Sequence, residues 1–264
     1  MPIEAHPVFV PPPNAGARIW RYTDLAKFLS VFDRSALFFP RLDKLEDPFE
    51  GSYTKSILAF QNAKFNDLPA EVRQQVGSEE ALQAIVGNQM QSRAFAKAQR
   101  EITFVNSWHS NQHESAAMWS QYLRTQEGIA IQSTYERLCK SLEGYEEFCV
   151  NVGMVNYIDY ENEAIPFGNI MYPTIYKRKS FEHEKELRAL IWTAQDGRNM
   201  FGSENKLKDV SGLYVPVDIP TLVERVYVAP TAPAWIRDLI ASLLKRFGHE
   251  IAVVQSSLAD KAFY

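Results

Sequence analysis

The sequence predicts an α+β protein: a single domain with a mixed or split central β-sheet flanked by helices, plus a peripheral helical insertion. Short apolar or alternating runs indicate strands, runs with apolar residues three or four apart indicate helices, and one long polar stretch lacks strong apolar anchors. The chain has 264 residues, of which 46% are hydrophobic and 23% charged. This usage is typical of a globular protein with a large core, and a chain of this size can form one undivided domain.

The first half of the chain is expected to run from an arm through two strands to a helical insertion. Three consecutive prolines remove backbone donors near the start, so that segment is expected to be an extended arm. Leu25, Phe28, Leu29 and Phe32 follow helical spacing, and Thr23 precedes them as a capping residue. The expected elements are an arm over 1–17, strands over 18–22 and 36–39, a helix from 23, and the helical insertion over about 53–100.

The second half of the chain, within the single domain 18–264, alternates strand and helix patterns. The run 184–192 alternates in character, so that Glu184, Glu186 and Arg188 would share one face of a strand. An apolar stripe near the C-terminus ends at Gly248, which is typical of a helix end. The expected strands are 102–108, 128–132, 148–157, 184–192, 226–229 and 251–254, and the expected helices are 114–124, 134–142 and 236–247.

Composition and charge exclude several classes of protein. The formal net charge of −4 provides no overall field that would attract a polyanion. Cys139 and Cys149 lack a CxxC partner or a histidine at ligand spacing, so both are expected to be reduced thiols. The chain has no apolar run of the roughly 18 residues that a membrane helix needs. We therefore expect a cytoplasmic protein without a membrane partner, and the pattern leaves the oligomeric state open.

The residues that could carry chemistry lie in three stretches rich in Arg, Trp, Tyr and acids. The sequence has no phosphate-binding glycine loop, dinucleotide fingerprint, metalloprotease helix or nucleophile elbow. The three stretches are Trp20-Arg21-Tyr22 with Asp47-Pro48-Phe49-Glu50, Ser107-Trp108 with Met118-Trp119-Ser120-Gln121-Tyr122, and His183-Glu184-Lys185-Glu186-Leu187-Arg188.

These stretches, in this order, resemble the bacterial domain-of-unknown-function family 2971. The resemblance covers most of the chain and is weakest over 53–100. The family brings no established activity with it. The further pieces that carry the resemblance are Leu37-Phe38-Phe39, Gly128 and Lys179.

A more distant resemblance links the same residues to the ADP-ribosyltransferase superfamily. Its members place an Arg or His on the first strand, a Ser, Thr or aromatic residue on a middle strand and a Glu on a late strand. The resemblance implies NAD as the substrate, with Arg21, Ser107 and Glu186 in those roles. Cleaving nicotinamide from NAD creates an oxocarbenium-like ribose that a carboxylate stabilises, while a cation holds the diphosphate or adenosine ribose and aromatic rings enclose the ligand. The middle residue is open between Ser107, Trp108 and Tyr122.

On this interpretation Glu186, Glu184 and Arg21 are catalytic, and no metal ligand is assigned. Two carboxylates close together repel each other unless a cation or a substrate compensates them. The acceptor of ADP-ribose would be a protein or a nucleic acid, or NAD would be hydrolysed, and a toxin or anti-phage role is expected from the type of family. The residues expected to bind NAD are Arg21, Tyr22, Ser107, Trp108, Trp119, Tyr122 and Arg188.

Other functions fit the same residues. Arg21 with Glu186 or Glu50 could be a structural ion pair, and the Trp and Tyr residues could be core. A metal-dependent nuclease would need Asp47, Glu50, Glu184 and Glu186 in one cleft, with Lys177 or Lys179 on a phosphate. A non-catalytic binding or regulatory domain is the third alternative. If Glu186 only stabilises a transition state, Glu186→Gln should remove activity and leave the melting temperature nearly unchanged.

Overall fold

A mixed β-sheet forms the centre of the protein. The computed structural model describes residues 6–60, 64–68, 70–122, 127–166, 169–194, 207, 209–260 and 262. Within these residues the sheet has seven strands in the order β11-β10-β4-β1-β3-β8-β5. The strands are β1 (Arg18–Thr23), β3 (Thr103–Ser110), β4 (Ile129–Thr134), β5 (Val150–Met154), β8 (Glu186–Trp192), β10 (Arg225–Val228) and β11 (Val253–Gln255). This arrangement confirms the predicted α+β fold class.

Strand β1 lies in the middle of the sheet and pairs unequally with its two neighbours. Its antiparallel ladder with β4 is complete, from Arg18 opposite Thr134 to Thr23 opposite Ile129. Its antiparallel ladder with β3 contains only the pairs Ile19–Ser110 and Trp20–His109. Beyond Trp20 the backbones of β1 and β3 no longer pair, so the sheet opens between them.

Two short sheets and several helices surround the central sheet. Helix α1 (Leu25–Arg34) directs its apolar face, with Phe28, Val31 and Phe32, into the core. Asp24, rather than Thr23, caps this helix, because its carboxylate accepts a hydrogen bond from the backbone N–H of Lys27 at 2.8 Å. The remaining elements are α1 (Leu25–Arg34), α5 (Ala116–Tyr122), α6 (Tyr135–Ser141), α7 (Ile219–Leu222), α8 (Ala234–Arg246), the antiparallel pair β2 (Ala36–Pro40) and β9 (Gly212–Pro216), and the parallel pair β6 (Asn156–Ile158) and β7 (Tyr176–Arg178).

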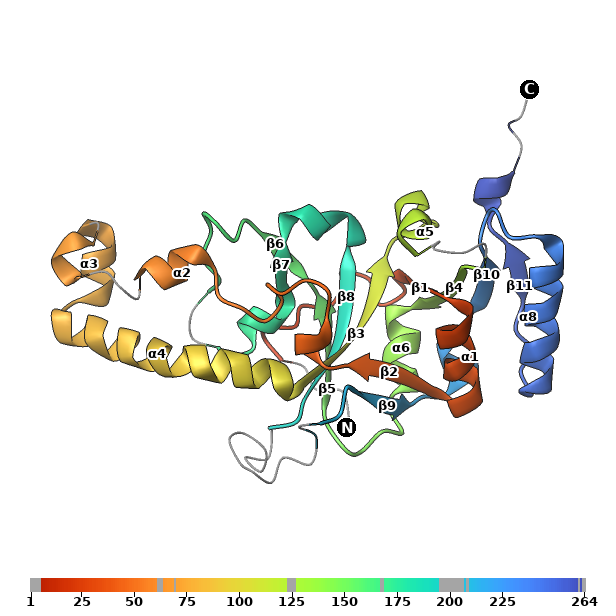
Figure 1. Cartoon of the computed structure of the whole chain (residues 1–264), viewed down its shortest axis with the longest axis horizontal. Coiled ribbons are helices and arrows are strands. Elements are labelled where there is room, and N and C mark those ends of the chain that lie inside the picture. Colours follow the sequence, from red (N-terminus) through yellow and green to blue (C-terminus); the bar gives the residue numbers. More distant parts are fainter. Residues whose placement is uncertain are drawn as a thin grey trace.

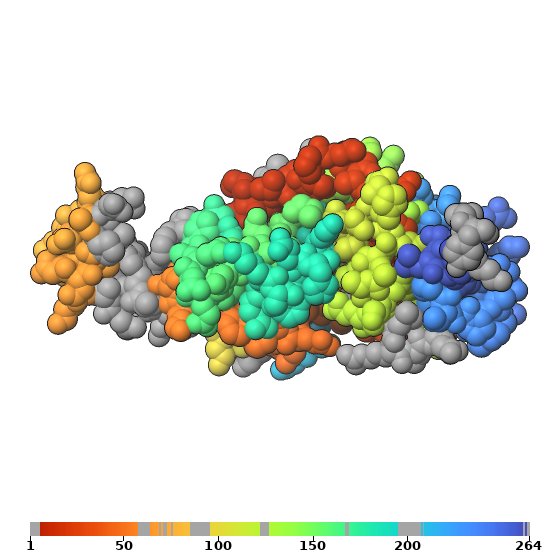
Figure 2. All heavy atoms as spheres, turned by 90° about the horizontal axis from the view of Figure 1, so that it is seen from above, coloured from red at the N-terminus to blue at the C-terminus, as the bar shows by residue number. Residues whose placement is uncertain are grey.

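A helical lobe projects from one end of the molecule, and α8 lies at the other end (Figure 1). In Figure 2 the gold atoms of α3 lie far from the blue C-terminal segment. Helix α4 leads from the lobe directly into β3. The lobe contains α2 (Lys55–Phe60), α3 (Ala70–Val76) and α4 (Glu79–Glu101).

Short 3-10 helices connect several of these elements. Within the described residues they are η1 (Leu42–Lys44), η2 (Phe65–Asp67), η3 (Tyr172–Ile175), η4 (Lys179–Glu184) and η5 (Ser257–Ala259).

The segment before β1 is anchored on the domain. Val8 and Phe9 are buried, and the carbonyl of Val10 accepts a hydrogen bond from the backbone N–H of Met154 at 2.8 Å. Gly153 permits this approach, since a Cβ atom there would lie 2.7 Å from the Cα atom of Phe9. Val8 and Phe9 therefore contribute to the core beside β5.

Across the described residues, no helix combines the length and the apolar character that crossing a membrane requires.

Candidate active site

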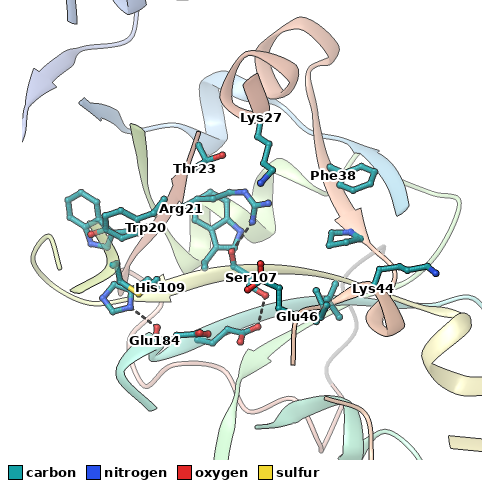
Figure 3. A pocket seen from close by; sticks show the side chains of 17 residues that line it. Trp20, Arg21, Thr23, Lys27, Phe38, Lys44, Glu46, Ser107, His109 and Glu184 are labelled. Carbon is teal, nitrogen blue, oxygen red and sulfur yellow. Dashed lines mark hydrogen bonds between the residues drawn. The ribbon is translucent and has the colours of Figure 1, made fainter. Parts of the chain in front are cut away.

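A pocket of about 390 Å³ lies where the sheet opens between β1 and β3. Its volume is in the range of small-molecule and cofactor sites. The wall combines aromatic rings, three cationic side chains and three carboxylates (Figure 3). The lining residues are Trp20, Arg21, Tyr22, Thr23, Lys27, Phe38, Pro40, Lys44, Leu45, Glu46, Val105, Ser107, Trp108, His109, Met118, Glu184 and Glu186.

Three neighbouring strands bring Arg21, Ser107 and Glu186 together in this pocket. Arg21 Nη1 donates to the backbone carbonyl of Ser107 at 2.8 Å, so the guanidinium bridges the opening where the β1–β3 ladder has ended. Ser107 Oγ donates to Glu186 Oε1 at 2.5 Å. Figure 3 shows both contacts as dashed lines. A cation, a hydroxyl and a carboxylate thus lie in sequence across β1, β3 and β8.

A buried ion cluster holds Glu186 from behind. Arg188 is fully buried and donates from Nε to Glu186 Oε1 at 2.7 Å, from Nη1 to the carbonyl of Thr174 at 2.7 Å, and from Nη2 to Glu50 Oε2. Lys177 Nζ lies 2.6 Å from Glu184 Oε2, 3.3 Å from Glu186 Oε2 and 3.5 Å from Glu50 Oε1. Three carboxylates therefore share two cations, so the cluster carries a formal excess of one negative charge.

The cluster separates the pKa values of its two most buried carboxylates. Burial alone would raise the pKa of Glu186, but the charges of Arg188 and Lys177 outweigh it and lower that pKa, so Glu186 is ionised at neutral pH. Burial raises the pKa of Glu50, and the Arg188 charge only partly opposes this. The pKa of Lys177 is raised despite burial, because Glu186 and Glu50 surround it. Of these two carboxylates, Glu186 is therefore the one that favours the charged form, and it is also the one that lines the pocket.

This burial changes the expectation for the variant Glu186→Gln. Glu186 is 2% exposed and receives bonds from Ser107, Arg188 and Lys177. Glu186→Gln removes the charge from these three buried contacts, and a hydrogen bond to a charged group stabilises the folded state more than a neutral one. The melting temperature of Glu186→Gln should therefore fall, in contrast to the sequence-based expectation, and activity has to be compared at a temperature at which both proteins are folded.

The four aromatic residues predicted to bind NAD do not all line the pocket. Tyr22 and Trp108 line the pocket, and Arg21 lies over the Trp108 ring at 6.0 Å from its centroid. Trp119 is buried behind the wall, where its ring packs edge-on against Tyr22 with centroids 5.0 Å apart and its Nε1 donates to Glu114 at 3.0 Å. Tyr122 ends α5, and its side chain lies outside the described part of the chain, as do residues 123–126.

Arg188 and Glu184 lie differently from the sequence-based expectation. Arg188 shares a strand with Glu186, as predicted, but it is fully buried in the ion cluster and does not line the pocket. Strand β8 begins at Glu186, and Glu184 is the last residue of η4, because Lys185 adopts a left-handed backbone with φ of 41° that breaks the strand alternation. Glu184 still lines the pocket, and it pairs with Lys177.

The carboxylates that a nuclease would need are held by basic side chains. Lys177 and Arg188 hold Glu50, Glu184 and Glu186. Asp47 Oδ1 lies 2.9 Å from Arg178 Nη2 and also accepts from the backbone N–H of Phe49, so it shapes the turn and forms an ion pair. The described residues contain no group of three or more His, Cys, Asp or Glu side chains arranged to hold a metal ion.

Sequence reasoning missed two polar residues of the site. Lys177 belongs to the basic run 177–179, and such a run is typical of a solvated face. Lys177 is nevertheless 7% exposed, because β7 directs it into the acidic cluster, whereas Lys179 pairs with Glu163 at the surface. A histidine without metal-type spacing is typically a surface residue or an orienting hydrogen-bond partner, but His109 is 4% exposed and lines the pocket. The two-residue spacing of Ser107 and His109 was the available signal, since it places both side chains on one face of a strand.

Comparisons with known proteins give only distant similarities. No family model and no curated protein matches the chain, so membership of family 2971 stays a prediction. Similar solved structures include DarT of Thermus sp. 2.9 in complex with NAD+, with a TM-score of 0.41, 8% identity, and coverage of 96% of this chain and 100% of that chain. The same DarT in complex with ADP-ribosylated ssDNA has a TM-score of 0.41 and 9% identity, with coverage of 96% of this chain and 99% of that chain. Its complex with carba-NAD+ has a TM-score of 0.40 and 8% identity, with coverage of 92% of this chain and 96% of that chain. At this level of similarity, residue roles have to come from the geometry of this chain.

Proposed function

We propose that the protein is an ADP-ribosyltransferase-like enzyme that binds NAD, cleaves the bond between nicotinamide and ribose, and passes ADP-ribose to a macromolecule or to water. The observation that supports this most strongly is the convergence of Arg21, Ser107 and Glu186 from three neighbouring strands in one pocket. These are the residues that the distant superfamily resemblance assigns to the three roles. The pocket also supplies aromatic walls suited to the rings of a dinucleotide.

The charge distribution of the site suits this reaction. As the nicotinamide–ribose bond breaks, the bonding electron pair leaves with nicotinamide, which becomes neutral, and positive charge develops on the ribose. Glu186 is ionised, and the cluster to which it belongs, with Glu50, Glu184, Lys177 and Arg188, has a formal excess of one negative charge. A fixed negative charge in a site of low polarity stabilises developing positive charge without reorganising in the transition state. Ser107 and Arg188 fix the orientation of the carboxylate.

The opposite wall suits the anionic part of NAD. Arg21 is half-buried, and a guanidinium makes strong, often bidentate hydrogen bonds with phosphate oxygens. Lys27 and Lys44 line the same pocket, and their side chains are 77% and 54% exposed. The diphosphate would therefore lie toward Arg21 and the lysines, and the nicotinamide ribose toward Glu186.

The acceptor of ADP-ribose is proposed only as a class, a protein or a nucleic acid. A toxin or anti-phage role also belongs to the proposal and rests on the type of family alone, and a cytoplasmic location stays an expectation from the sequence.

The decisive assay is release of nicotinamide from NAD by the purified protein. Glu186→Gln should reduce release by about 100-fold or more, since removing one electrostatic stabiliser typically costs 10²–10³ in rate. Glu224→Gln is the matched control, because Glu224 is exposed beside β10 and does not line the pocket. Its release rate should equal that of the wild type.

Folding has to be separated from chemistry in this assay. Each variant should be assayed below its own unfolding transition, as followed by circular dichroism. Full release by folded Glu186→Gln would contradict the proposal and would leave Glu186 as a structural partner of Arg188 and Lys177.

A further inference from the structure

His109 is a pocket residue that the proposed reaction has not yet used. It lies on β3 two residues after Ser107 and directly opposite Glu186 in the β3–β8 ladder, so the three side chains lie on one face of the sheet. On its other side His109 pairs with Trp20 of β1, the last pair before the sheet opens. The imidazole therefore lies at the closed end of the opening, on the residue that pairs with Glu186, the proposed ribose-stabilising carboxylate. Figure 3 shows the imidazole next to Glu184, to which a dashed line joins it.

The hydrogen bonds of His109 define its tautomer. Nδ1 lies 2.6 Å from the backbone carbonyl of Glu184, and a carbonyl oxygen can only accept a hydrogen bond. Nδ1 therefore carries the hydrogen, and Nε2 carries the lone pair of a neutral ring. Nε2 is buried, and within the described part of the chain it has no hydrogen-bond partner. A buried acceptor without a partner has a desolvation cost that calls for a functional reason.

The surroundings of the ring favour its neutral form. Burial lowers the pKa of His109, the bond to the Glu184 carbonyl partly opposes this, and Lys185 lowers the pKa further. Tyr22 packs edge-on against the ring with centroids 6.1 Å apart, and burial keeps Tyr22 protonated by raising its pKa to about 12. The charged and titratable groups around the ring are His183 and Glu184 from η4, Lys185 from the following turn, Glu186 from β8 and Tyr22 from β1.

The neighbouring carboxylates are poorly suited to accept a proton. Glu186 already receives bonds from Ser107, Arg188 and Lys177, and Glu184 is paired with Lys177. The lone pairs of these two carboxylates are engaged in these contacts, whereas among the described residues the lone pair of His109 Nε2 has no partner. Proton acceptance at this end of the pocket therefore falls to the imidazole.

We propose that His109 Nε2 is the general base that takes the proton of the attacking group when ADP-ribose is transferred. This inference rests on the proposed function. The nicotinamide–ribose bond breaks with its electron pair leaving on nicotinamide, a lone pair of the acceptor forms the new bond to ribose C1′, and the acceptor's proton passes to Nε2. When water is the acceptor, the products are nicotinamide, ADP-ribose and an imidazolium that returns its proton to solvent.

The test uses NAD as the substrate and water as the acceptor, with two variants that remove different parts of the ring. His109→Asn keeps a donor near the Nδ1 position and lacks Nε2, and His109→Gln keeps a polar group near Nε2 that does not take up a proton. Both should retain the NAD-dependent rise in melting temperature, and both should lose about 100-fold or more of nicotinamide release. His113→Gln is the matched control, since His113 is exposed and lies outside the pocket lining.

The pH dependence of nicotinamide release gives a second readout. In the wild type, release should fall tenfold per pH unit on the acid side of the His109 pKa, which lies below the ordinary value of 6.5, because protonated Nε2 cannot accept a proton. This acid limb should be absent from the residual activity of His109→Gln. Nitrogen NMR of the histidines should show His109 as the Nδ1–H tautomer at neutral pH.

The possible outcomes separate this inference from the proposed function. A wild-type protein that neither binds NAD nor releases nicotinamide overturns the proposed function and the base together. Wild-type binding and release that both His109 variants retain within about threefold overturn the base alone, as would an acid limb that persists in His109→Gln or a Nε2–H tautomer. Binding without release also counts against the base, because water would then not be activated at the site.

Discussion

The two sides of β1 differ in how the same sheet is held together. Toward β4, the ladder is continuous over six residue pairs, and the buried residues beside it include the apolar Ile129, Ile131 and Val226. Toward β3, the ladder ends after two pairs, and the nearby buried side chains include Arg188 and Glu186. One side is stabilised by backbone pairing and apolar packing, and the other by hydrogen bonds and ion pairs.

This difference separates stability from the proposed chemistry. Apolar packing on the β4 side can form without any ligand. The β3 side keeps an open pocket, an unequal number of charges and an imidazole nitrogen for which the described residues supply no partner. Such features reduce stability and are typical of functional sites. Substitutions on the two sides should therefore affect stability and activity in different proportions.

The largest expected effect is that of Arg188→Met on the charged side. Arg188 is fully buried between Glu186 and Glu50, so its removal leaves these buried carboxylates and Glu184 with Lys177 as the one cation that the described residues of the cluster supply. The free energy of unfolding should fall by about 3–5 kcal/mol in urea denaturation. Adding Glu50→Gln should recover part of this loss, because one unpaired charge is removed. A loss below about 1 kcal/mol would show that the cluster is solvated.

On the apolar side, Ile131→Ala should reduce stability by about 2–5 kcal/mol, because it leaves a cavity in the core. The rate of nicotinamide release per folded molecule should stay at the wild-type value. Urea denaturation checks the loss of stability. The release assay, run at a temperature below the unfolding transition of the variant, checks the rate. Loss of release without loss of stability would contradict the separation between the two sides of β1.

Ser107→Ala tests the boundary between the two sides. The hydroxyl of Ser107 makes a 2.5 Å hydrogen bond with an ionised carboxylate, so its loss should lower the unfolding free energy by about 1.5–3 kcal/mol. The change should also reduce nicotinamide release, because Glu186 loses one of the contacts that orient it. Ser257→Ala is the matched control, because Ser257 lies on η5 outside the pocket lining. Wild-type release by folded Ser107→Ala would remove Ser107 from the proposed mechanism.

The smallest expected effect concerns the acid dependence of stability. Because the folded pKa of Glu186 is lowered, its contribution to stability is complete above the ordinary value of 4.5 and is lost as the pH falls through the lowered pKa. The raised pKa of Glu50 has the opposite sign, and its contribution is complete below 4.5 and is lost as the pH rises through the raised pKa. The stability difference between the wild type and Glu186→Gln should therefore shrink on acidification, as measured by urea denaturation across this range. A constant difference would contradict the lowered pKa.

Much of the fold could be predicted from local patterns. The strands near 18–22, 102–108 and 128–132 are predictable because each is a short run rich in apolar residues, which is typical of a buried strand. Strand pairing was not predictable in the same way. Strands β2 and β9 form a separate pair although 171 residues lie between them, and that pairing depends on tertiary packing rather than on either sequence run.

The candidate site was predictable where roles depend on one strand at a time. Arg21, Ser107 and Glu186 each lie on a recognisable strand, and their sequence order fits a known pattern. The ion cluster was not predictable, because Glu50 and Arg188 are separated by 138 positions and Lys177 lies in a basic run that gives no sign of burial. The position of Glu184 was missed because the left-handed backbone of Lys185 has no signal in the residue type.

The proposed function requires that the opening between β1 and β3 binds NAD through Arg21. The most direct test is the melting temperature of the wild type, Arg21→Ala and the matched control Arg225→Ala, each with millimolar NAD in the presence of EDTA. Because a ligand of the native state raises the melting temperature by mass action, the account predicts a rise for the wild type and Arg225→Ala and none for Arg21→Ala. No rise in the wild type, together with stabilisation by Mg²⁺ or Mn²⁺ that Glu184→Gln removes, would contradict the account and favour a nuclease. No response to either ligand would favour a binding domain.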